Sequence, residues 1–256
     1  MLNNDQNPLG ILIPMDEEIE LLLTQVEVLS EVKLASRVFY IARLAGKDII
    51  LVKSGVGKVA SSFTASLLIH NFKVGAILIT GVAGGIADFT KVGDIAIATD
   101  AVQHDMDCRP IFPQFEIPRT GISFFKSDNV LTEKLQQAAN QFVSSEFENP
   151  ASMETLQELG LDLPKIHLGR LASGDQFIGT YNQWEKIRAE VMDTLFVEME
   201  GAAVAQVCHD SGTPWCSVRT ISDKANAEAH VDFNLFLHRA AKLYTAGIVR
   251  KFVELL

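Results

Sequence analysis

Residues 10–23 have the sequence GILIPMDEEIELLL, in which a short apolar run is followed at once by a stretch of helical period. The run Gly10–Ile13 is typical of a buried strand. Acidic residues crowd the start of the next stretch, where the dipole of a helix favours negative charge. Its apolar positions recur at helical spacing: Ile19, Leu22, Leu23, Val26 and Leu29. The segment therefore predicts a strand followed by a helix, the unit from which α/β folds are built.

The same alternation continues along the chain. Further strands are expected at 37–44, 48–53, 74–80, 92–99, 166–172, 195–199 and 215–221, the first two forming a hairpin around residues 45–47. Helices are expected at about 58–71, 131–142, 182–193, 201–211 and 232–254. Residues 103–123 contain three prolines and are expected to form a long loop, often a functional feature. We predict a single α/β domain over residues 1–256, in which the polar residues 144–164 are an insertion.

Composition excludes several classes of protein. The chain has 256 residues, of which 48% are hydrophobic, and this globular balance excludes a disordered, collagen-like or disulfide-scaffold protein. A net charge of −10 without a basic run disfavours nucleic acid and anionic membranes as partners. The three cysteines show no paired spacing, which favours a reducing compartment. Because no targeting segment is visible, we expect a cytoplasmic location.

Acidic residues follow three of the expected strands. In α/β folds ligands bind at the carboxyl ends of strands, so these acids are candidates for a site. Asp16, Glu17 and Glu18 follow the first strand. Charging of a helix N-terminus is the favoured explanation for Asp16 and Glu17, and nothing in the pattern separates Glu18 from them. Asp223 ends the last strand, either as a site residue or as a helix cap.

The pair Glu198 and Glu200 lies at the end of an otherwise apolar strand. A buried carboxylate is costly unless it is paired or hydrogen-bonded, so the pair indicates a functional site. The alternative is that Glu198 forms an ion pair and Glu200 caps the next helix. If the strand continues through both residues, alternation places them on one face.

Other motifs mainly exclude classes of site: dinucleotide and P-loop sites, a zinc site and a Ser-His-Asp or Cys-His nucleophile. Residues 80–85, TGVAGG, let the backbone approach a ligand or form a tight turn, but they lack the spacing of a dinucleotide or P-loop motif. His104, Asp105 and Asp107 are metal-type ligands whose spacing matches no zinc pattern, so no metal is expected. No Ser-His-Asp or Cys-His arrangement can be recognised.

Seven blocks, taken together and in order, resemble bacterial 5′-methylthioadenosine/S-adenosylhomocysteine nucleosidases of the purine nucleoside phosphorylase/uridine phosphorylase superfamily. The blocks are MDEE at 15–18, KSGVGK at 53–58, TGVAGG at 80–85, KVGDI at 91–95, SGDQFI at 173–178, VEME at 197–200 and RTISD at 219–223. The resemblance covers about residues 10–255, apart from 144–164. It implies a three-layer α/β/α fold around a mixed, partly barrel-like sheet, and a homodimer. It also implies hydrolysis of an adenine nucleoside by water, with neither a metal nor an organic cofactor.

The same resemblance implies roles for individual residues. Glu18 would activate the attacking water, Asp223 would give a proton to N7 of the base, and Glu200 would hold the ribose hydroxyls. Further substrate contacts would come from Ser222 beside Asp223; from Met199, Arg219 and Phe233 around the ribose; from Phe177, Ile178, Ala83 and Gly84 at the base; and from Met15 and Val56 at the 5′ end. Such chemistry builds positive charge on the ribose, which carboxylates stabilise.

Three departures from the family pattern leave the 5′ substituent open. Val82 stands where the family commonly has a small hydroxyl residue, residues 108–113 do not align, and residues 144–164 are inserted. The substituent is thus methylthio, homocysteinyl or a bulkier group such as that of 6-amino-6-deoxyfutalosine, a precursor in menaquinone synthesis. A purine nucleoside phosphorylase is the rival enzyme, but the acids after the first strand would repel phosphate. A catalytically silent nucleoside-binding protein is the rival from another class, and the presence of Glu18, Glu200 and Asp223 argues against it.

Overall fold

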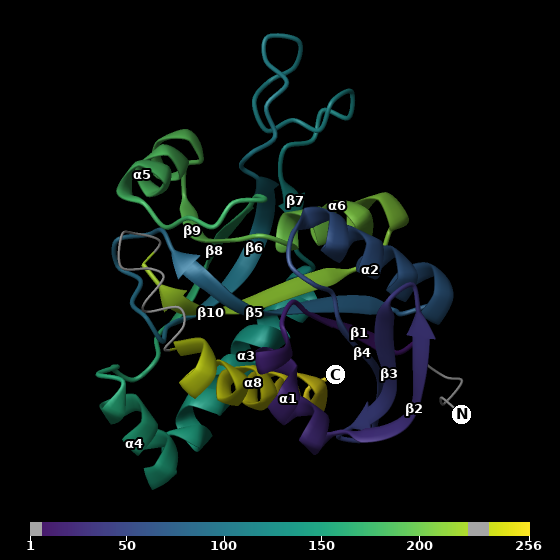
Figure 1. Cartoon of the computed structure of the whole chain (residues 1–256), viewed down its shortest axis with the longest axis vertical. Coiled ribbons are helices and arrows are strands. Elements are labelled where there is room, and N and C mark those ends of the chain that lie inside the picture. The colour runs from purple at the N-terminus through teal and green to yellow at the C-terminus, as the bar shows by residue number, and fades with distance from the viewer. Residues whose placement is uncertain (1–6, 225–235) are drawn as a thin grey trace.

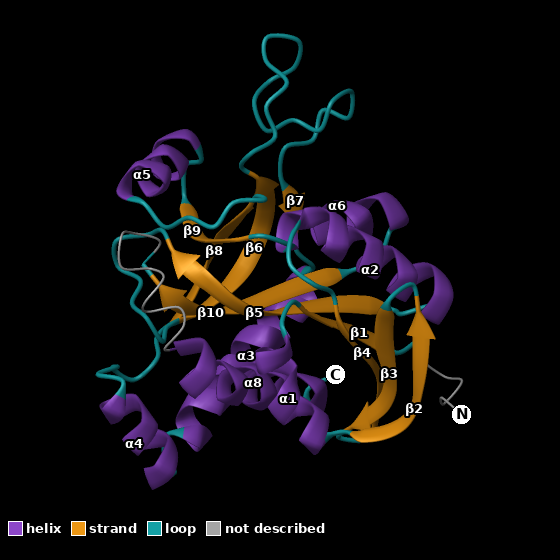
Figure 2. Ribbon diagram, in the orientation of Figure 1, coloured by secondary structure: helices purple, strands orange, loops and turns teal. Residues whose placement is uncertain are grey.

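A computed structural model describes residues 7–224 and 236–256 as an α/β structure with one large mixed sheet (Figures 1 and 2). Its strands are β1 (Leu9–Ile13), β2 (Glu27–Leu34), β3 (Arg37–Leu44), β4 (Lys47–Lys53), β5 (Ala76–Gly85), β6 (Ile95–Gln103), β7 (Phe125–Lys126), β8 (Ile166–Ser173), β9 (Thr194–Glu198) and β10 (Trp215–Asp223). Its helices are α1 (Asp16–Gln25), α2 (Lys58–Phe72), α3 (Asn129–Glu146), α4 (Pro150–Glu158), α5 (Tyr181–Glu190), α6 (Gly201–Ser211) and α8 (Lys242–Glu254), the last preceded by a π-helical turn at Leu237–Ala241.

Part of the sheet closes on itself. The strand order is β10-β6-β8-β9-β5-β1-β4-β3-β2, and β10 also pairs with β5. The strands β5, β9, β8, β6 and β10 therefore form a closed ring, from which β1, β4, β3 and β2 extend as an open sheet. Parallel and antiparallel pairs both occur, so the prediction of a mixed, partly barrel-like sheet is confirmed.

Helices cover the sheet in two groups. α2 packs against α6 on one side, whereas α8 packs against both α1 and α3 on the other (Figure 2). The apolar faces of α1, α3 and α8 and the strands above them share one buried cluster, which contains Leu22, Leu135 and Phe252. Burial of these apolar faces favours folding, and the pairing of the strands brings their carboxyl ends together at one place.

The helix that begins at Asp16 is shorter than the sequence predicted. It ends at Gln25, and residues 27–34 form β2, so assigning Val26 and Leu29 to the helix was wrong. β2 turns into β3 through Ala35 and Ser36, both with positive φ, and pairs with it in an antiparallel hairpin. The error has a physical reason: an exposed edge strand needs no alternation of apolar and polar residues, and here the spacing imitates a helix.

Residues 80–85 are not a turn into a helix. They continue β5 to Gly85, where Gly84 and Gly85 pair with β9. In the segment 144–164, α3 continues to Glu146 and α4 follows, with Leu156 buried against the core. Residues 104–124, between β6 and β7, form the expected long loop, which projects from the top of the view in Figure 1. The expected helix at 232–254 begins outside the described residues, and its described part ends at Glu254.

Candidate active site

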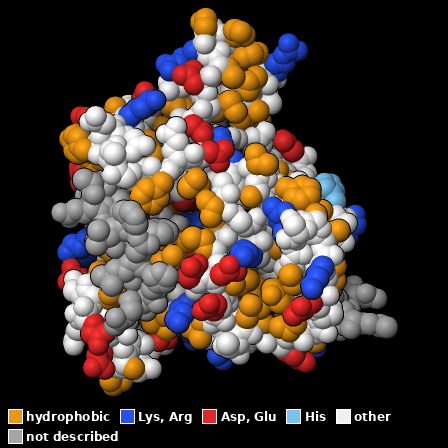
Figure 3. Space-filling view, in the orientation of Figure 1, with side chains coloured by type: hydrophobic (Ala, Val, Ile, Leu, Met, Phe, Trp, Pro, Cys, Tyr) orange, Lys and Arg blue, Asp and Glu red, His pale blue; other side chains and the backbone are white. Residues whose placement is uncertain are grey.

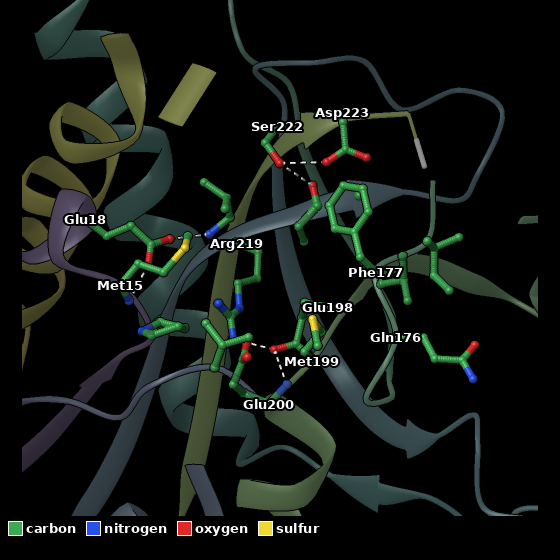
Figure 4. Close-up of a pocket in the computed structure, with 17 residues that line it drawn as sticks. Met15, Glu18, Gln176, Phe177, Glu198, Met199, Glu200, Arg219, Ser222 and Asp223 are labelled. Carbon is green, nitrogen blue, oxygen red and sulfur yellow. Dashed lines mark hydrogen bonds and ion pairs between the residues drawn. The ribbon is translucent and has the colours of Figure 1, made fainter. Parts of the chain in front are cut away.

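A pocket of about 240 Å³ opens beside the carboxyl ends of β1, β5, β9 and β10 (Figure 4). Its lining includes residues far apart in the chain: Pro14, Met15, Glu18, Val56, Val82, Ala83, Gly84, Gln176, Phe177, Ile178, Val197, Glu198, Met199, Glu200, Arg219, Ser222 and Asp223. Every substrate-contacting residue expected from the sequence is in this set, except Phe233, which lies outside the described residues. The fold therefore brings the expected carboxylates Glu18, Glu200 and Asp223 to one cavity.

Glu18 lies in the first turn of α1 and is fully buried. Its Oε2 accepts the backbone N–H of Met15 at 3.1 Å, and its Oε1 accepts the N–H of Val82 at 2.8 Å. Burial raises the pKa of Glu18 to about 7, although the charge of Arg219 and the two N–H groups act in the opposite direction. Near neutral pH this carboxyl group can therefore both take up and release a proton.

Arg219 holds two further carboxylates inside the molecule. Its Nη2 contacts Glu198 and lies 3.3 Å from Oε2 of Glu200. Glu198 also accepts the backbone N–H groups of Glu200, at 3.1 Å, and of Gly201. The ion pair expected of Glu198 as an alternative role is thus present, and the same residue fixes the backbone that carries Glu200.

Glu200 is positioned from a second side as well. β9 ends at Glu198, and Glu200 lies at the cap position before α6, so strand alternation does not relate the two acids. Its Oε1 accepts the backbone N–H of Gly57 at 2.8 Å. Burial, followed by the neighbouring charge of Glu198, raises the pKa of Glu200. Glu200 also lines the pocket (Figure 4).

Asp223 and Ser222 end β10 across the pocket from Glu200 (Figure 4). The hydroxyl of Ser222 lies 2.9 Å from Oδ2 of Asp223 and 3.3 Å from the carbonyl oxygen of Ala83. Both side chains are buried. Phe177 faces the same cavity and remains 47% exposed, so an aromatic face stands at its rim.

Sequence reasoning missed part of this site. Glu198, Gln176, Pro14 and Val197 line the pocket but were not predicted as substrate contacts. For Glu198 a signal existed, since an acid inside an apolar strand needs a partner. That partner, Arg219, is 21 residues away, and only the pairing of the folded strands reveals it.

Three further findings concern metal sites, membrane spans and cysteines. Within residues 7–224 and 236–256, no three His, Cys, Asp or Glu side chains are grouped so that they could hold a metal ion. No described helix is both long enough and apolar enough to cross a membrane. The three cysteines are free, and Cys208 and Cys216 are buried.

A partly closed mixed sheet between two helical layers, with its pocket at the strand ends, defines a nucleoside phosphorylase-like α/β protein. The chain belongs to the phosphorylase superfamily, whose family model matches residues 8–254.

Individual relatives cover almost the whole chain. A 5′-methylthioadenosine/S-adenosylhomocysteine nucleosidase of Staphylococcus aureus (strain bovine RF122 / ET3-1) is 34% identical over 234 residues, which are 91% of this chain and 93% of the relative. The nucleosidase of Neisseria meningitidis, solved in complex with methylthio-immucillin-A, has a TM-score of 0.86 at 31% identity, covering 98% of this chain and 100% of that one. A futalosine hydrolase of Helicobacter pylori strain 26695 has a TM-score of 0.84 at 32% identity, covering 99% and 100%.

Proposed function

We propose that the protein hydrolyses the N-glycosidic bond of 5′-methylthioadenosine and S-adenosylhomocysteine, releasing adenine and the 5′-substituted ribose. The observation that carries the proposal is the convergence of Glu18, Glu200 and Asp223, from three distant segments, on one cavity. The names of the relatives support the same substrates. Water is the co-substrate, and neither a metal nor an organic cofactor takes part.

Glu18 is the proposed base that activates water. Breaking the bond between the ribose and the base gives the sugar an oxocarbenium character, and the water that attacks it must lose a proton. A pKa of about 7 makes the carboxylate available at neutral pH and basic enough to take that proton. The two N–H groups of Met15 and Val82 hold both oxygens in place before the substrate arrives.

Asp223 is the proposed acid that serves the leaving base. Adenine leaves more readily as a neutral molecule than as an anion, so a proton delivered to N7 lowers the barrier. The Ser222 hydroxyl orients the Asp223 carboxyl group, since it lies within hydrogen-bond distance. A positioned proton transfer of this kind is typically worth about 10²–10⁴ in rate.

The other lining residues bind the parts of the nucleoside. Glu200 accepts the vicinal ribose hydroxyls, and Arg219, whose buried Nε has no hydrogen-bond partner within the described part of the chain, adds a donor on that side. The proposed contacts are Met199 and Phe233 for the ribose, Phe177, Ile178, Ala83 and Gly84 for adenine, and Met15 and Val56 for the 5′ substituent. Phe177 stacks on the base, because its ring stands at the rim of the cavity.

An assay of adenine release from 5′-methylthioadenosine tests the proposal. The wild-type protein is expected to release adenine without phosphate, at a rate that added phosphate does not change. Asp223→Asn is expected to lower kcat by about 10²–10⁴. Formation of a ribose 1-phosphate, or equal rates for the two proteins, would contradict the proposed chemistry.

The phosphorylase alternative lacks support in the pocket. Phosphate requires charge-assisted donors, usually more than one. Among the described residues that line the cavity, Arg219 is the one cation, and two glutamates already engage it. A phosphate dianion would meet Glu18 and Glu200 instead.

A 6-amino-6-deoxyfutalosine hydrolase is the second candidate, favoured by the similarity to the Helicobacter pylori futalosine hydrolase. The difference between the two functions lies in the 5′ substituent, which the proposed contacts Met15 and Val56 would meet. Comparing kcat/KM for methylthioadenosine, S-adenosylhomocysteine and 6-amino-6-deoxyfutalosine decides between them. Methylthioadenosine as the best substrate is the expected result and would support a role in methionine salvage, which we propose to take place in the cytoplasm.

We also propose that the protein is a homodimer. Val59 and Phe63 lie one turn apart on α2 and are 81% and 44% exposed. Ile111, on the projecting loop, is 79% exposed, and Figure 3 shows hydrophobic side chains along that projection. Such apolar surface is typical of an interface. Light scattering is expected to give twice the chain mass of 28.1 kDa, and Val59→Glu is expected to shift the mass toward the monomer.

A further inference from the structure

Asp105 stands at the foot of the projecting loop, outside the pocket lining, yet it is bonded to two segments that lead into the pocket. Its Oδ1 lies 2.6 Å from Nζ of Lys58, and its Oδ2 accepts the backbone N–H of Asp175 at 3.0 Å. The side chains of Lys58 and Asp105 keep only 17% and 21% of their surface exposed. Both carboxylate oxygens of Asp105 thus face N–H donors in a largely covered place.

Each of these two donors is next in the chain to residues on a different side of the site, one on the adenine side and one on the ribose side. Asp175 directly precedes the pocket-lining residues 176–178, of which Phe177 and Ile178 are proposed to contact adenine. Lys58 directly follows Gly57, whose backbone N–H donates to Glu200 at 2.8 Å. One carboxylate outside the pocket therefore ties together the base side and the ribose side.

The two segments are also bonded to each other. The backbone N–H of Lys58 donates to Oδ1 of Asp175 at 2.8 Å, and Nζ of Lys58 lies 3.1 Å from Oε1 of Gln103. A Cβ on Gly57 would lie 3.1 Å from Oδ1 of Asp175, so the segments are closely packed at this point. Asp105, Lys58 and Asp175 form a closed cluster, and such networks hold their members more firmly than isolated surface ion pairs do.

We propose that Asp105 is a positioning residue, which holds residues 176–178 and Glu200 in one arrangement through Asp175 and Lys58. The nucleoside then meets both halves of its site already in place, and binding does not have to order them. The inference rests on the proposed function, because that function gives the two halves their substrate. It also makes the foot of the projecting loop part of the binding apparatus.

Asp105→Asn is the first test. An amide nitrogen would then face the N–H of Asp175 or the Lys58 ammonium, so one of the two bonds is lost whichever way the amide turns. We expect KM for 5′-methylthioadenosine to rise about tenfold, as when one more residue must be ordered on binding, and kcat to change less than about threefold. The dissociation constant of adenine, measured by calorimetry, is expected to rise as well. Adenine binds and dissociates without a chemical step, so this dissociation constant reports binding alone.

Two sets of variants serve as controls. Asp162→Asn removes the exposed ion pair with Lys91, outside the pocket lining, and is expected to leave both constants unchanged. At position 175 the order is informative: Asp175→Ala is expected to weaken adenine binding more than Asp175→Asn, because asparagine keeps an acceptor for the N–H of Lys58. Lys58→Met removes the bond to Asp105 but keeps the backbone N–H that donates to Asp175, so it is expected to raise both constants as Asp105→Asn does. It carries the test if Asp105→Asn does not fold.

Adenine affinity within twofold of wild type in Asp105→Asn, or in Lys58→Met if Asp105→Asn does not fold, would overturn the positioning role. A change in kcat alone would also contradict it. A wild-type protein that binds adenine but releases none from 5′-methylthioadenosine would instead refute the proposed hydrolysis, and the calorimetric comparison would still decide the role of Asp105.

Discussion

Glu18 shows at the scale of one residue how burial and hydrogen bonding share the control of a carboxyl group. Complete burial favours the protonated form, whereas Arg219 and the backbone N–H groups of Val82 and Met15 favour the charged form. Burial has the larger effect, and the pKa of Glu18 rises from the ordinary value of 4.5 to about 7. A base of the proposed kind needs this balance, because a carboxylate with an ordinary pKa takes a proton only weakly.

The balance predicts the pH dependence of the reaction. The base must be ionised, so kcat/KM is expected to fall tenfold for each pH unit below about 7. Glu18→Gln is expected to lower kcat by about 10²–10⁴. The measurement is kcat/KM for 5′-methylthioadenosine from pH 5 to 9. An acidic limb near pH 4.5, the ordinary value for a glutamate, would contradict the raised pKa of the proposed base.

The same residue predicts a pH-dependent stability. The folded state holds the Glu18 proton more tightly than the unfolded chain, so its contribution to stability is lost as the pH rises from 4.5 through 7, on the order of 3 kcal/mol in all. Glutamine carries no charge and avoids that loss, although it leaves one of two backbone N–H groups without an acceptor. The difference in Tm between Glu18→Gln and wild type is thus expected to move in favour of the variant between pH 5 and pH 8. A difference independent of pH would contradict the raised pKa.

At the scale of one element, β5 shows why a strand contains glycines. Gly81 has φ +144°, and a Cβ there would lie 2.5 Å from Nη1 of Arg219 and 2.6 Å from Oε1 of Glu18. The strand must therefore lack a side chain at this position for the two charged groups to pack against it. The glycine keeps Arg219 close to Glu18, and this closeness limits the rise in the pKa of Glu18.

Gly81→Ala is accordingly expected to lower kcat by about 10²-fold, because it displaces Glu18 and Arg219. Strain adds a loss of about 1–3 kcal/mol in unfolding free energy. Gly46→Ala is the matched control: Gly46 also has a positive φ, but a Cβ added there would meet no atom within 4 Å, so only the strain is expected. Urea unfolding and the adenine-release assay measure both effects. Equal kcat in the two variants would contradict the close approach.

Local and long-range features differ in how well the sequence predicts them. The change from β1 to α1 was predictable, because an apolar run, a proline and three acids in a row mark it within a few residues. The exposed strand β2 was not, since its spacing imitates a helix. The candidate residues came largely from a family resemblance. The bonds of Lys58 to Asp105 and Asp175 join positions 47 and 117 residues apart, and no local pattern contains them.

At the scale of the whole molecule, the segment 144–164 shows that the core extends beyond the helices and strands around the pocket. α4 lines no part of the pocket, yet Leu156 is buried and Phe147 contacts Phe142 and Tyr244. The segment is therefore attached to the main core through apolar contacts, although its composition is polar.

Leu156→Ala is expected to lower the unfolding free energy by about 2–5 kcal/mol, as buried leucine truncations do. Because α4 contributes no lining residue, KM and kcat are expected to remain at wild-type values at temperatures where the variant is folded. Leu159→Ala, at a partly buried position on the same segment, is expected to cost less. Urea denaturation gives both values, and a loss below about 0.5 kcal/mol for Leu156→Ala, the range of ordinary surface substitutions, would show that α4 does not share the core.

The closed ring of strands also has a consequence for solubility. Because β10 pairs back onto β5, the end of the sheet nearest the site offers no free row of backbone groups to another chain. The long exposed edge is β2, which carries Glu27, Glu31 and Lys33 on a strand interrupted by a bulge. Charges and bulges on an edge discourage a second copy from adding its own strand. Replacing those three side chains with valine would turn this edge into a template for aggregation.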